Sequence, residues 1–216
     1  MLEHAATLDS QQADKQLAEI TRSLKHLVEQ IRKERPDVVM SLDKGARILL
    51  KPIERYLRKS GNVEKTVFTP YNVTALKSTR LEEPGASEAR ALQDFGAFKG
   101  KKVFFIDETF SMGRNAVATL WAADVAGVGE SKYFALTDAQ SINPRVVGLQ
   151  KFREQGRVHV CPHNIEILFT RPAGSMYLDD TNPDGIRPHK VDSEKRKDDF
   201  KKVAEVRRKI YKALLS

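Results

Sequence analysis

The sequence predicts an α/β protein in which a parallel sheet is flanked by helices. Short apolar runs alternate along the chain with longer segments of helical periodicity, and this alternation favours parallel strands covered on both faces. The run at 103–106 contains only Val, Phe and Ile, as is typical of a strand buried on both sides. A chain of 216 residues with 40% hydrophobic and 31% charged residues is long enough to bury such a core as one domain.

The first helix is predicted at residues 12–34, where apolar residues recur at steps of three and four and therefore share one face. Pro36 ends this pattern, and the apolar run at 38–40 predicts the first strand. We expect residues 1–35 to form an N-terminal helical extension of a core that spans 36–140. The apolar positions of the helix are Leu17, Ile20, Leu24, Leu27, Val28 and Ile31.

After the first strand, the turn-forming residues at 43–45 predict a loop, and helical spacing resumes at 46–57. Residues 63–69 predict a second strand. The polar segment 70–88 predicts a long loop, and loops of that length in compact domains are commonly lids or binding loops.

The strand at 103–106 is expected to end at Asp107, and apolar spacing predicts a helix at 116–126. The remaining predicted strands are short, and a C-terminal helix carries the local excess of positive charge. We expect one domain over residues 1–216, in which 141–188 supply loops and a hood. The later strands are expected at 133–136, 157–161 and 165–169, and the basic helix within 189–216.

The residues between the strand at 103–106 and the helix at 116–126 predict a phosphate site. Ligands of open α/β sheets gather beyond the carboxyl ends of strands, and a helix N-terminus offers unpaired N–H groups to a phosphate. Gly113 permits close backbone approach or a left-handed conformation. Ser111 and Asn115 can donate hydrogen bonds, and the carboxylates of Asp107 and Glu108 can accept them from hydroxyls.

An apolar strand, two acids and a small-residue turn with glycine, as at 103–115, resemble the phosphoribosyl-pyrophosphate (PRPP) loop of type I phosphoribosyltransferases. The resemblance implies a phosphoribosyltransferase-like fold in which Asp107 and Glu108 contact the ribose hydroxyls. Thr109, Met112 and Asn115 depart from the residues usual in that family. The residues that would hold the 5-phosphate are Ser111, Met112, Gly113, Arg114 and Asn115.

An earlier segment, at 37–46, resembles the strand and pyrophosphate loop of the same family. The resemblance implies that the diphosphate binds there, and that a cis peptide lies near the bond from Leu42 to Asp43. The residues of this loop are Asp43, Lys44, Gly45 and Ala46.

The segment 70–88 occupies the place of the family's catalytic loop, and Lys77 and Arg80 are its available cations. The resemblance implies transfer of a 5-phosphoribosyl group between PRPP and a nitrogenous base, or the reverse exchange. It also implies Mg²⁺, held mainly through PRPP and in part by Asp107 and Glu108, and it is compatible with a homodimer. The acceptor base is not encoded in any motif of the chain.

The net charge of +8 suits an anionic partner, either a phosphate-rich small molecule or a nucleic acid. The cations of residues 189–216 are interleaved with acids, which is common on a solvated helix face. The resemblance also implies an alternative function, because some members of the family are non-catalytic regulators that sense PRPP or a nucleotide and bind nucleic acid.

Three further features favour ordinary explanations. His159, Cys161 and His163 alternate as on a strand face, but a structural zinc site needs a fourth ligand. The single cysteine cannot form an internal disulfide, and the chain lacks a signal peptide and any long apolar run. We therefore expect a cytoplasmic protein without a membrane partner.

Overall fold

The structure is a computed structural model of the chain. Among the residues that it describes, no helix is both long and apolar enough to cross a membrane. The described residues are 10–61, 63–71, 92–110, 113–138, 148–160, 176–178, 186–188, 204–205 and 207–216.

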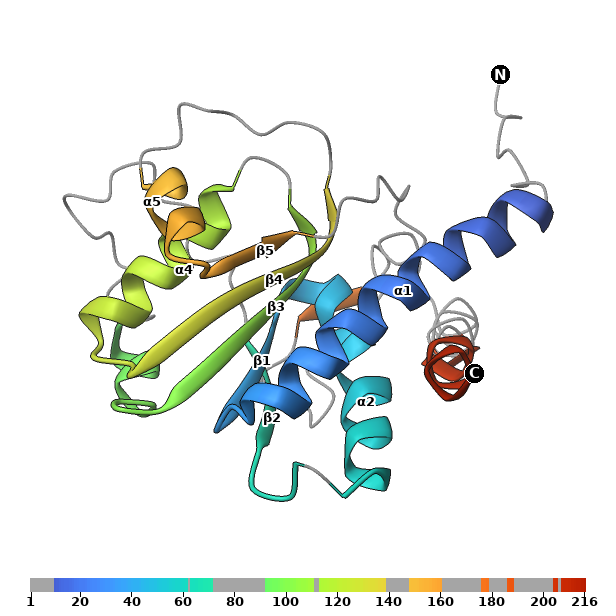
Figure 1. Cartoon of the computed structure of the whole chain (residues 1–216), viewed down its shortest axis with the longest axis horizontal. Coiled ribbons are helices and arrows are strands. Elements are labelled where there is room, and N and C mark those ends of the chain that lie inside the picture. The colour runs from blue at the N-terminus through green and yellow to red at the C-terminus, as the bar shows by residue number, and fades with distance from the viewer. Residues whose placement is uncertain are drawn as a thin grey trace.

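Five parallel strands form the central sheet in the spatial order β2-β1-β3-β4-β5 (Figure 1). Val38, at the start of β1, lies opposite Val67 of β2 and Val103 of β3. The sheet therefore grows in one direction from β1 to β2 and in the other from β1 through β3, β4 and β5. The strands are β1 (Val38–Leu42), β2 (Val67–Tyr71), β3 (Lys102–Phe110), β4 (Glu130–Asp138) and β5 (Val158–Val160).

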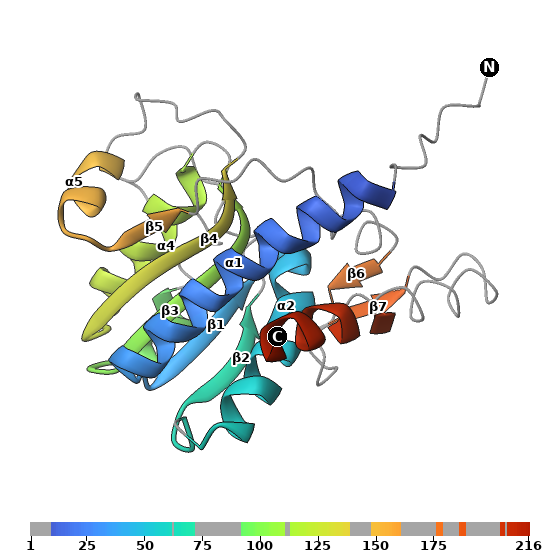
Figure 2. The ribbon, with the colours of Figure 1, turned by 45° about the vertical axis from the view of Figure 1, so that its right-hand side comes forward.

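Helices cover both faces of this sheet, which confirms the predicted α/β class. Figure 2 shows α1, α2 and the C-terminal helix on one side, with α4 and α5 on the other. The labelled helices are α1 (Ser10–Glu34), α2 (Asp43–Lys59), α4 (Arg114–Val125) and α5 (Leu149–Glu154). Further helical segments occur at 92–96 and 207–215.

The core has two layers because successive strand residues point to opposite faces of a sheet. Phe104 and Ile106 of β3 pack with α1 and α2, whereas Phe105 packs with α4 and α5. On the first side, the part of the predicted apolar stripe of α1 whose side chains are described is buried: Leu24 and Ile31 have no exposed surface. The first helix is therefore part of the core packing.

The C-terminal helix also packs on the core. Ile210 and Leu214, one helical turn apart, are buried in the same cluster as α1 and α2, and the guanidinium of Arg55 lies 4.6 Å from the ring centroid of Tyr211. An antiparallel pair, β6 (Met176–Leu178) and β7 (Ile186–Pro188), forms a second small sheet, and β6 contacts α2.

Two boundaries differ from the prediction at points that matter for the site. The helix predicted at 46–57 begins at Asp43, so the predicted loop at 43–45 is wrong. Asp107 does not end its strand, because β3 continues to Phe110 and pairs with β4 as far as Asp138. Backbone pairing does not require apolar side chains, and the polar composition after Ile106 concealed the continuation.

The second strand is shifted relative to the predicted 63–69, since β2 runs from Val67 to Tyr71. The predicted strand at 165–169 and the rest of the long loop, 72–88, lie outside the described residues.

Candidate functional site

The strands β1 and β3 lie side by side, but the helices that follow them cover opposite faces of the sheet. Helix α2, after β1, packs on the α1 side, and α4, after β3, packs on the other side. In open α/β sheets this divergence leaves a crevice at the carboxyl ends of the two strands, where ligands bind. The register places Ser41 opposite Ile106, so the chain after β1 emerges beside Asp107. The two predicted phosphate-binding segments therefore follow neighbouring strands at the carboxyl end of the sheet.

Helix α2 starts directly after β1. Leu42 is the N-cap, in extended conformation with φ −96° and ψ 134°, and it makes no side-chain capping hydrogen bond. Residues 43–46 form its first turn, in which the backbone N–H groups have no partner within the helix. Such a turn attracts anions through its N–H groups and the helix dipole. Among residues 43–46, side-chain placement is described only for Ala46, which is fully buried.

The expected cis peptide near Leu42 and Asp43 is wrong, since the described backbone contains no cis peptide bond. The extended N-cap explains this difference. Leu42 turns the chain from strand to helix in a single residue with ordinary dihedral angles, and no strained loop intervenes.

Helix α4 begins in a similar way, at Arg114. Gly113 is its N-cap in the left-handed region, with φ 76°, and again no side chain caps the helix. This positive φ requires glycine, which agrees with the predicted role of Gly113. Asn115 is half-buried in the first turn, whereas Ser111, Met112 and the side chain of Arg114 lie outside the described residues. Two uncapped helix N-termini thus flank the crevice.

The two acids of the predicted ribose site are both buried, with 6% of each residue exposed. Because β3 continues past them, alternation directs their side chains to opposite faces. Asp107 shares the face of Phe105 toward α4, and Glu108 shares the face of Ile106 toward α2. The acids therefore approach the crevice from its two sides.

Hydrogen bonds from β4 and from the next residue of β3 hold Asp107. The Tyr133 hydroxyl, from the neighbouring strand β4, donates to Asp107 Oδ2 at 2.5 Å, and the Glu108 backbone N–H donates to Asp107 Oδ1 at 2.7 Å. A hydroxyl donor and a backbone donor fix the plane of the carboxyl group, whose two oxygens act as acceptors.

Glu108 has different chemistry from its neighbour. Burial, and then the adjacent charge of Asp107, raise the pKa of Glu108 from 4.5 to about 8. At neutral pH its carboxyl group is therefore mostly protonated and can donate a hydrogen bond as well as accept one. Carboxyl groups whose surroundings shift the pKa strongly are common at functional sites.

Two residues near the carboxyl ends of the strands escaped the sequence reasoning. Tyr133 lies on β4 and reaches Asp107 across the sheet. Arg47 of α2 is buried, with 1% of its surface exposed. Arg47 could have been identified from the sequence, because it is a cation in the first two turns of a helix that follows a strand. Tyr133 could not, because in the sequence it is simply one residue of a predicted strand.

The predicted lid cations, Lys77 and Arg80, lie outside the described residues. The described residues before and after this segment contact each other: the Tyr71 hydroxyl, at the end of β2, donates a hydrogen bond to Asp94 Oδ2 at 3.1 Å. The Tyr71 ring also lies 5.0 Å from that of Phe95. Tyr71 pairs with Leu42 in the sheet, so the described residues on the two sides of the segment 72–91 lie near the carboxyl ends of the strands.

A metal could bind here only with few protein ligands. Among the described residues, no group of three or more His, Cys, Asp and Glu side chains is arranged to hold an ion. Mg²⁺ needs only one or two carboxylates when a ligand's phosphates complete its shell, and Asp107 supplies a suitable oxygen donor. His159 is described, whereas Cys161 and His163, the other members of the considered zinc set, lie outside the described residues.

No protein-family model matches the sequence, and no curated protein is significantly similar to it. Solved structures show partial similarity. The HGPRT-ase of Leishmania tarentolae in complex with GMP is 11% identical, with a TM-score of 0.41 over 58% of this chain and 67% of its own. For the purine phosphoribosyltransferase of Pyrococcus horikoshii the identity is 17% and the TM-score 0.38, over 56% of this chain and 73% of its own. For a hypoxanthine phosphoribosyltransferase of Staphylococcus aureus the identity is 14% and the TM-score 0.38, over 71% of this chain and 72% of its own. All three similar structures are phosphoribosyltransferases.

Proposed function

We propose that the protein transfers a 5-phosphoribosyl group between PRPP and a nitrogenous base, or runs the reverse exchange. One observation carries this proposal: two uncapped helix N-termini, of α2 and α4, flank a crevice next to the adjacent acids Asp107 and Glu108. PRPP presents two separate phosphate groups joined by a sugar with two free hydroxyls. The crevice therefore offers a partner for each part of the molecule.

The start of α4 is the proposed site of the 5-phosphate. Gly113 brings the backbone close, and the first-turn N–H groups from Arg114 onward face a bound anion. Ser111, Met112 and Asn115 complete this proposed loop. The first turn of α2, with Asp43, Lys44, Gly45 and Ala46, would take the diphosphate in the same manner.

The two acids would then bind the ribose hydroxyls with complementary roles. Asp107, oriented by Tyr133, accepts a hydrogen bond from one hydroxyl. Glu108, mostly protonated at neutral pH, can donate to a second hydroxyl or accept from it. Burial strengthens these bonds because the local dielectric is low.

In the proposed reaction, the bond between ribose C1 and the diphosphate oxygen breaks, and C1 bonds to a nitrogen of the base. The electron pair leaves with the diphosphate, so negative charge grows beside the first turn of α2, where oriented N–H groups stabilise it. Mg²⁺ bound to PRPP would neutralise part of this charge, with Asp107 as its available protein ligand. Lys77 and Arg80, which lie outside the described residues, are proposed to add positive charge during the reaction.

Isothermal calorimetry with PRPP and Mg²⁺ tests the proposal. We expect micromolar binding by the wild type and at least a hundredfold weaker binding by the double variant Asp107→Asn, Glu108→Gln. The matched control is Glu130→Gln, which removes a carboxylate at the start of β4, at the amino end of the sheet. Diphosphate release from PRPP in the presence of a panel of bases would then establish turnover. Equal binding by all three proteins, or no binding by the folded wild type, would refute the proposed site.

The alternative, a regulator that binds nucleic acid, is favoured by one observation. While Ile210 and Leu214 face the core, Arg208, Lys209 and Lys212 of the same helix are exposed. Nucleic-acid affinity that falls steeply with salt, together with PRPP binding and no diphosphate release, would support the regulator in place of the transferase.

A further inference from the structure

Helix α2 and the C-terminal helix at 207–215 together form a basic surface. Both helices pack on the α1 side of the sheet, and Figure 2 shows them beside each other. The guanidinium of Arg55 on α2 lies 4.6 Å from the ring centroid of Tyr211 on the C-terminal helix, so the outer faces of the two helices adjoin. The exposed cations of this basic surface are Lys51, Arg55, Arg58 and Lys59 of α2, and Arg208, Lys209 and Lys212 of the C-terminal helix.

The cations of α2 form a row along the helix. Lys51, Arg55 and Arg58 recur at steps of four and three residues, which places them on one face. Successive members of the row are therefore roughly 5 Å apart along the helix axis. Ile53 and Leu57, on the opposite face, are fully buried, so the row is directed away from the sheet.

The C-terminal helix presents a charged outer face as well. Its apolar residues Ile210 and Leu214 are buried in the core, whereas Arg208, Lys209 and Lys212 are exposed. A helix that binds a membrane surface directs its apolar face to the lipid, but here that face is packed against the protein. A partner of this helix is therefore attracted mainly by charge.

Acids neutralise only part of the positive charge of the basic surface. Glu54 pairs with Lys51 at 3.5 Å and with Arg58 at 3.0 Å, and Glu205 pairs with Lys209 at 3.1 Å. Exposed ion pairs of this kind contribute little, so the surface keeps an excess of positive charge that can bind an external anion. The cations that make no ion pair within the described part of the chain are Arg55, Lys59, Arg208 and Lys212.

Aromatic rings hold two of the guanidinium groups in place. Arg55 lies over Tyr211, and the guanidinium of Arg58 lies 5.5 Å from the ring centroid of Phe68 on β2. An arginine that is already positioned loses less conformational freedom when it binds, and its planar group pairs with a phosphate through two hydrogen bonds. Both rings are half-buried beneath the arginines, so the surface offers phosphate contacts and not a platform for stacked bases.

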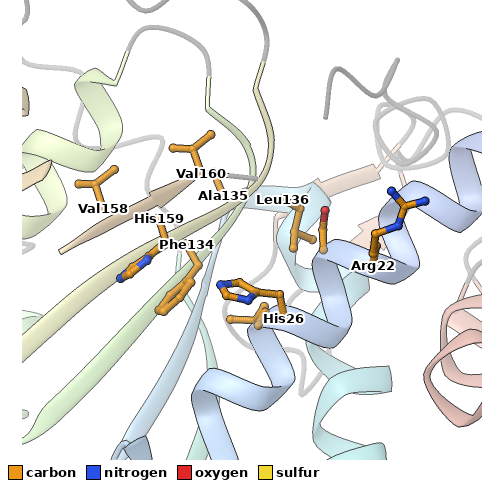
Figure 3. Close-up of a pocket in the computed structure, with 10 residues that line it drawn as sticks. Arg22, His26, Phe134, Ala135, Leu136, Val158, His159 and Val160 are labelled. Atoms are coloured by element: carbon orange, nitrogen blue, oxygen red, sulfur yellow. The ribbon is translucent and has the colours of Figure 1, made fainter. Parts of the chain in front are cut away.

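The cavity between α1 and the strands β4 and β5 has a different character (Figure 3). Its volume is about 480 Å³, and Arg22 is the only lysine or arginine among the described residues that line it. Most of the other lining side chains are apolar, so this cavity does not suit a polyanion. The basic surface does, because its cations are numerous and regularly spaced.

We propose that the basic surface binds the phosphate backbone of a nucleic acid without reading its sequence. A nucleic acid carries a negative charge on every nucleotide, so a row of cations meets a row of phosphates. An acidic peptide lacks such a regular repeat of charge. The inference goes beyond the regulator considered above, because the surface includes none of the residues proposed to bind PRPP and would serve a transferase equally well.

Fluorescence anisotropy with a labelled DNA duplex of about 20 base pairs tests the inference. We expect micromolar affinity at about 50 mM salt, and a slope of log K against log salt of about −5, which corresponds to roughly five or six neutralised phosphates. Two duplexes of unrelated sequence should bind equally. Polyglutamate and phosphatidylserine vesicles should fail to compete at equal charge. Equal competition by either would mean that the surface binds anions of any kind, and would overturn the proposal.

A triple variant tests whether the basic surface is the binding site. Lys59→Gln, Arg208→Gln and Lys212→Gln together remove three exposed charges that make no ion pair in the described part of the chain, so the fold should be retained. We expect binding to weaken about tenfold or more and the salt slope to fall by about 3. PRPP binding, measured by calorimetry, should be unchanged, which separates this inference from the proposed transferase function.

The matched control removes the same net charge elsewhere. Lys99, Lys101 and Lys151 are exposed and belong to neither α2 nor the C-terminal helix, so their joint replacement by glutamine should leave nucleic-acid affinity nearly unchanged. Equal weakening by the two triple variants would show that net charge alone attracts the duplex. That result, or no binding by the folded wild type at low salt, would overturn the inference.

Discussion

The two ends of the central sheet treat their charged groups in opposite ways. At the amino end, Glu34 binds the ammonium groups of Lys132 and Lys102 at 2.7 and 2.9 Å, and Lys102 also reaches Glu130 at 3.1 Å. At the carboxyl end, two adjacent acids are buried beside two uncapped helix N-termini. Acids and cations at the amino end satisfy one another, whereas the carboxyl end keeps strong donors and acceptors directed at a crevice. The ion pairs stabilise the amino end, whereas the carboxyl end carries the groups that we propose bind PRPP.

The pKa shifts of the acids follow this division. Burial by itself would raise the pKa of Glu34, but the hydrogen bonds and charges of Lys132 and Lys102 outweigh it and lower the pKa. The pKa of Glu108 is instead raised to about 8 by burial and by Asp107. The two ends of the sheet should therefore respond to pH with opposite signs.

The largest expected effect concerns Glu108 and the pH dependence of stability. The pKa of Glu108 in the folded protein lies above its usual value of 4.5, so its contribution to stability is complete below pH 4.5 and is lost as pH rises toward about 8. That interval corresponds to about 5 kcal/mol. Glu108→Gln cannot ionise, so the free energy of unfolding of this variant should fall less than that of the wild type between pH 5 and 8.

Urea unfolding of both proteins at several pH values measures this difference. The control is Glu130→Gln, whose carboxylate is half-exposed at the amino end. Parallel stability curves for wild type and Glu108→Gln across the interval would mean that Glu108 is ionised in the folded protein.

The next effect is on ligand binding and tests the carboxyl end directly. Asp107→Asn keeps the shape of the side chain but removes the charge that Tyr133 and the Glu108 backbone hold in place. If the transferase proposal is correct, kcat/KM for PRPP should fall by about 10²–10³-fold. Steady-state diphosphate release measures it, with Glu130→Gln as the control. If Asp107→Asn had normal kinetics, Asp107 would have no role in the reaction.

Tyr133→Phe should have a smaller effect through orientation. It removes the hydroxyl that donates to Asp107 Oδ2 and leaves the ring, which is 1% exposed, in the core. We expect a loss of about 1–3 kcal/mol in the free energy of unfolding, and about a tenfold fall in kcat/KM as the carboxylate gains freedom. Phe134→Leu, a change of similar burial on the same strand, controls for core packing. Tyr133 would have no positioning role if both variants lost stability without any difference in kinetics.

The fold could be predicted from the sequence because its signals are local. The apolar runs at 38–40 and 103–106 predict strands wherever they lie, and the stripe of α1 predicts which face is buried. Gly113 was identified as a position that needs glycine, and its φ of 76° agrees. These features depend on residues within one or two turns of each other.

The site was predicted less completely because its geometry depends on contacts distant in sequence. Tyr133 reaches Asp107 from 26 residues away, and no local pattern indicates that bond. The residues at 43–45 suit a turn, but an acid at the first position of a helix is equally favourable because of the helix dipole. The choice between a turn at 43–45 and a helix that begins at Asp43 depends on how α2 packs against the sheet, which the local sequence does not show.

The smallest expected effect is at the amino end, where Glu34→Gln should weaken the ion pairs without touching the crevice. The lowered pKa of Glu34 means that its contribution is present above pH 4.5 and is lost as pH falls, opposite in sign to that of Glu108. Since the Glu34 side chain is 15% exposed and the lysines about a fifth, we expect a loss of roughly 1 kcal/mol at neutral pH, reduced by salt. Thermal unfolding at low and high ionic strength measures it, while PRPP affinity should stay unchanged. A large loss of affinity in this variant would mean that the two ends of the sheet are coupled, and their division of roles would fail.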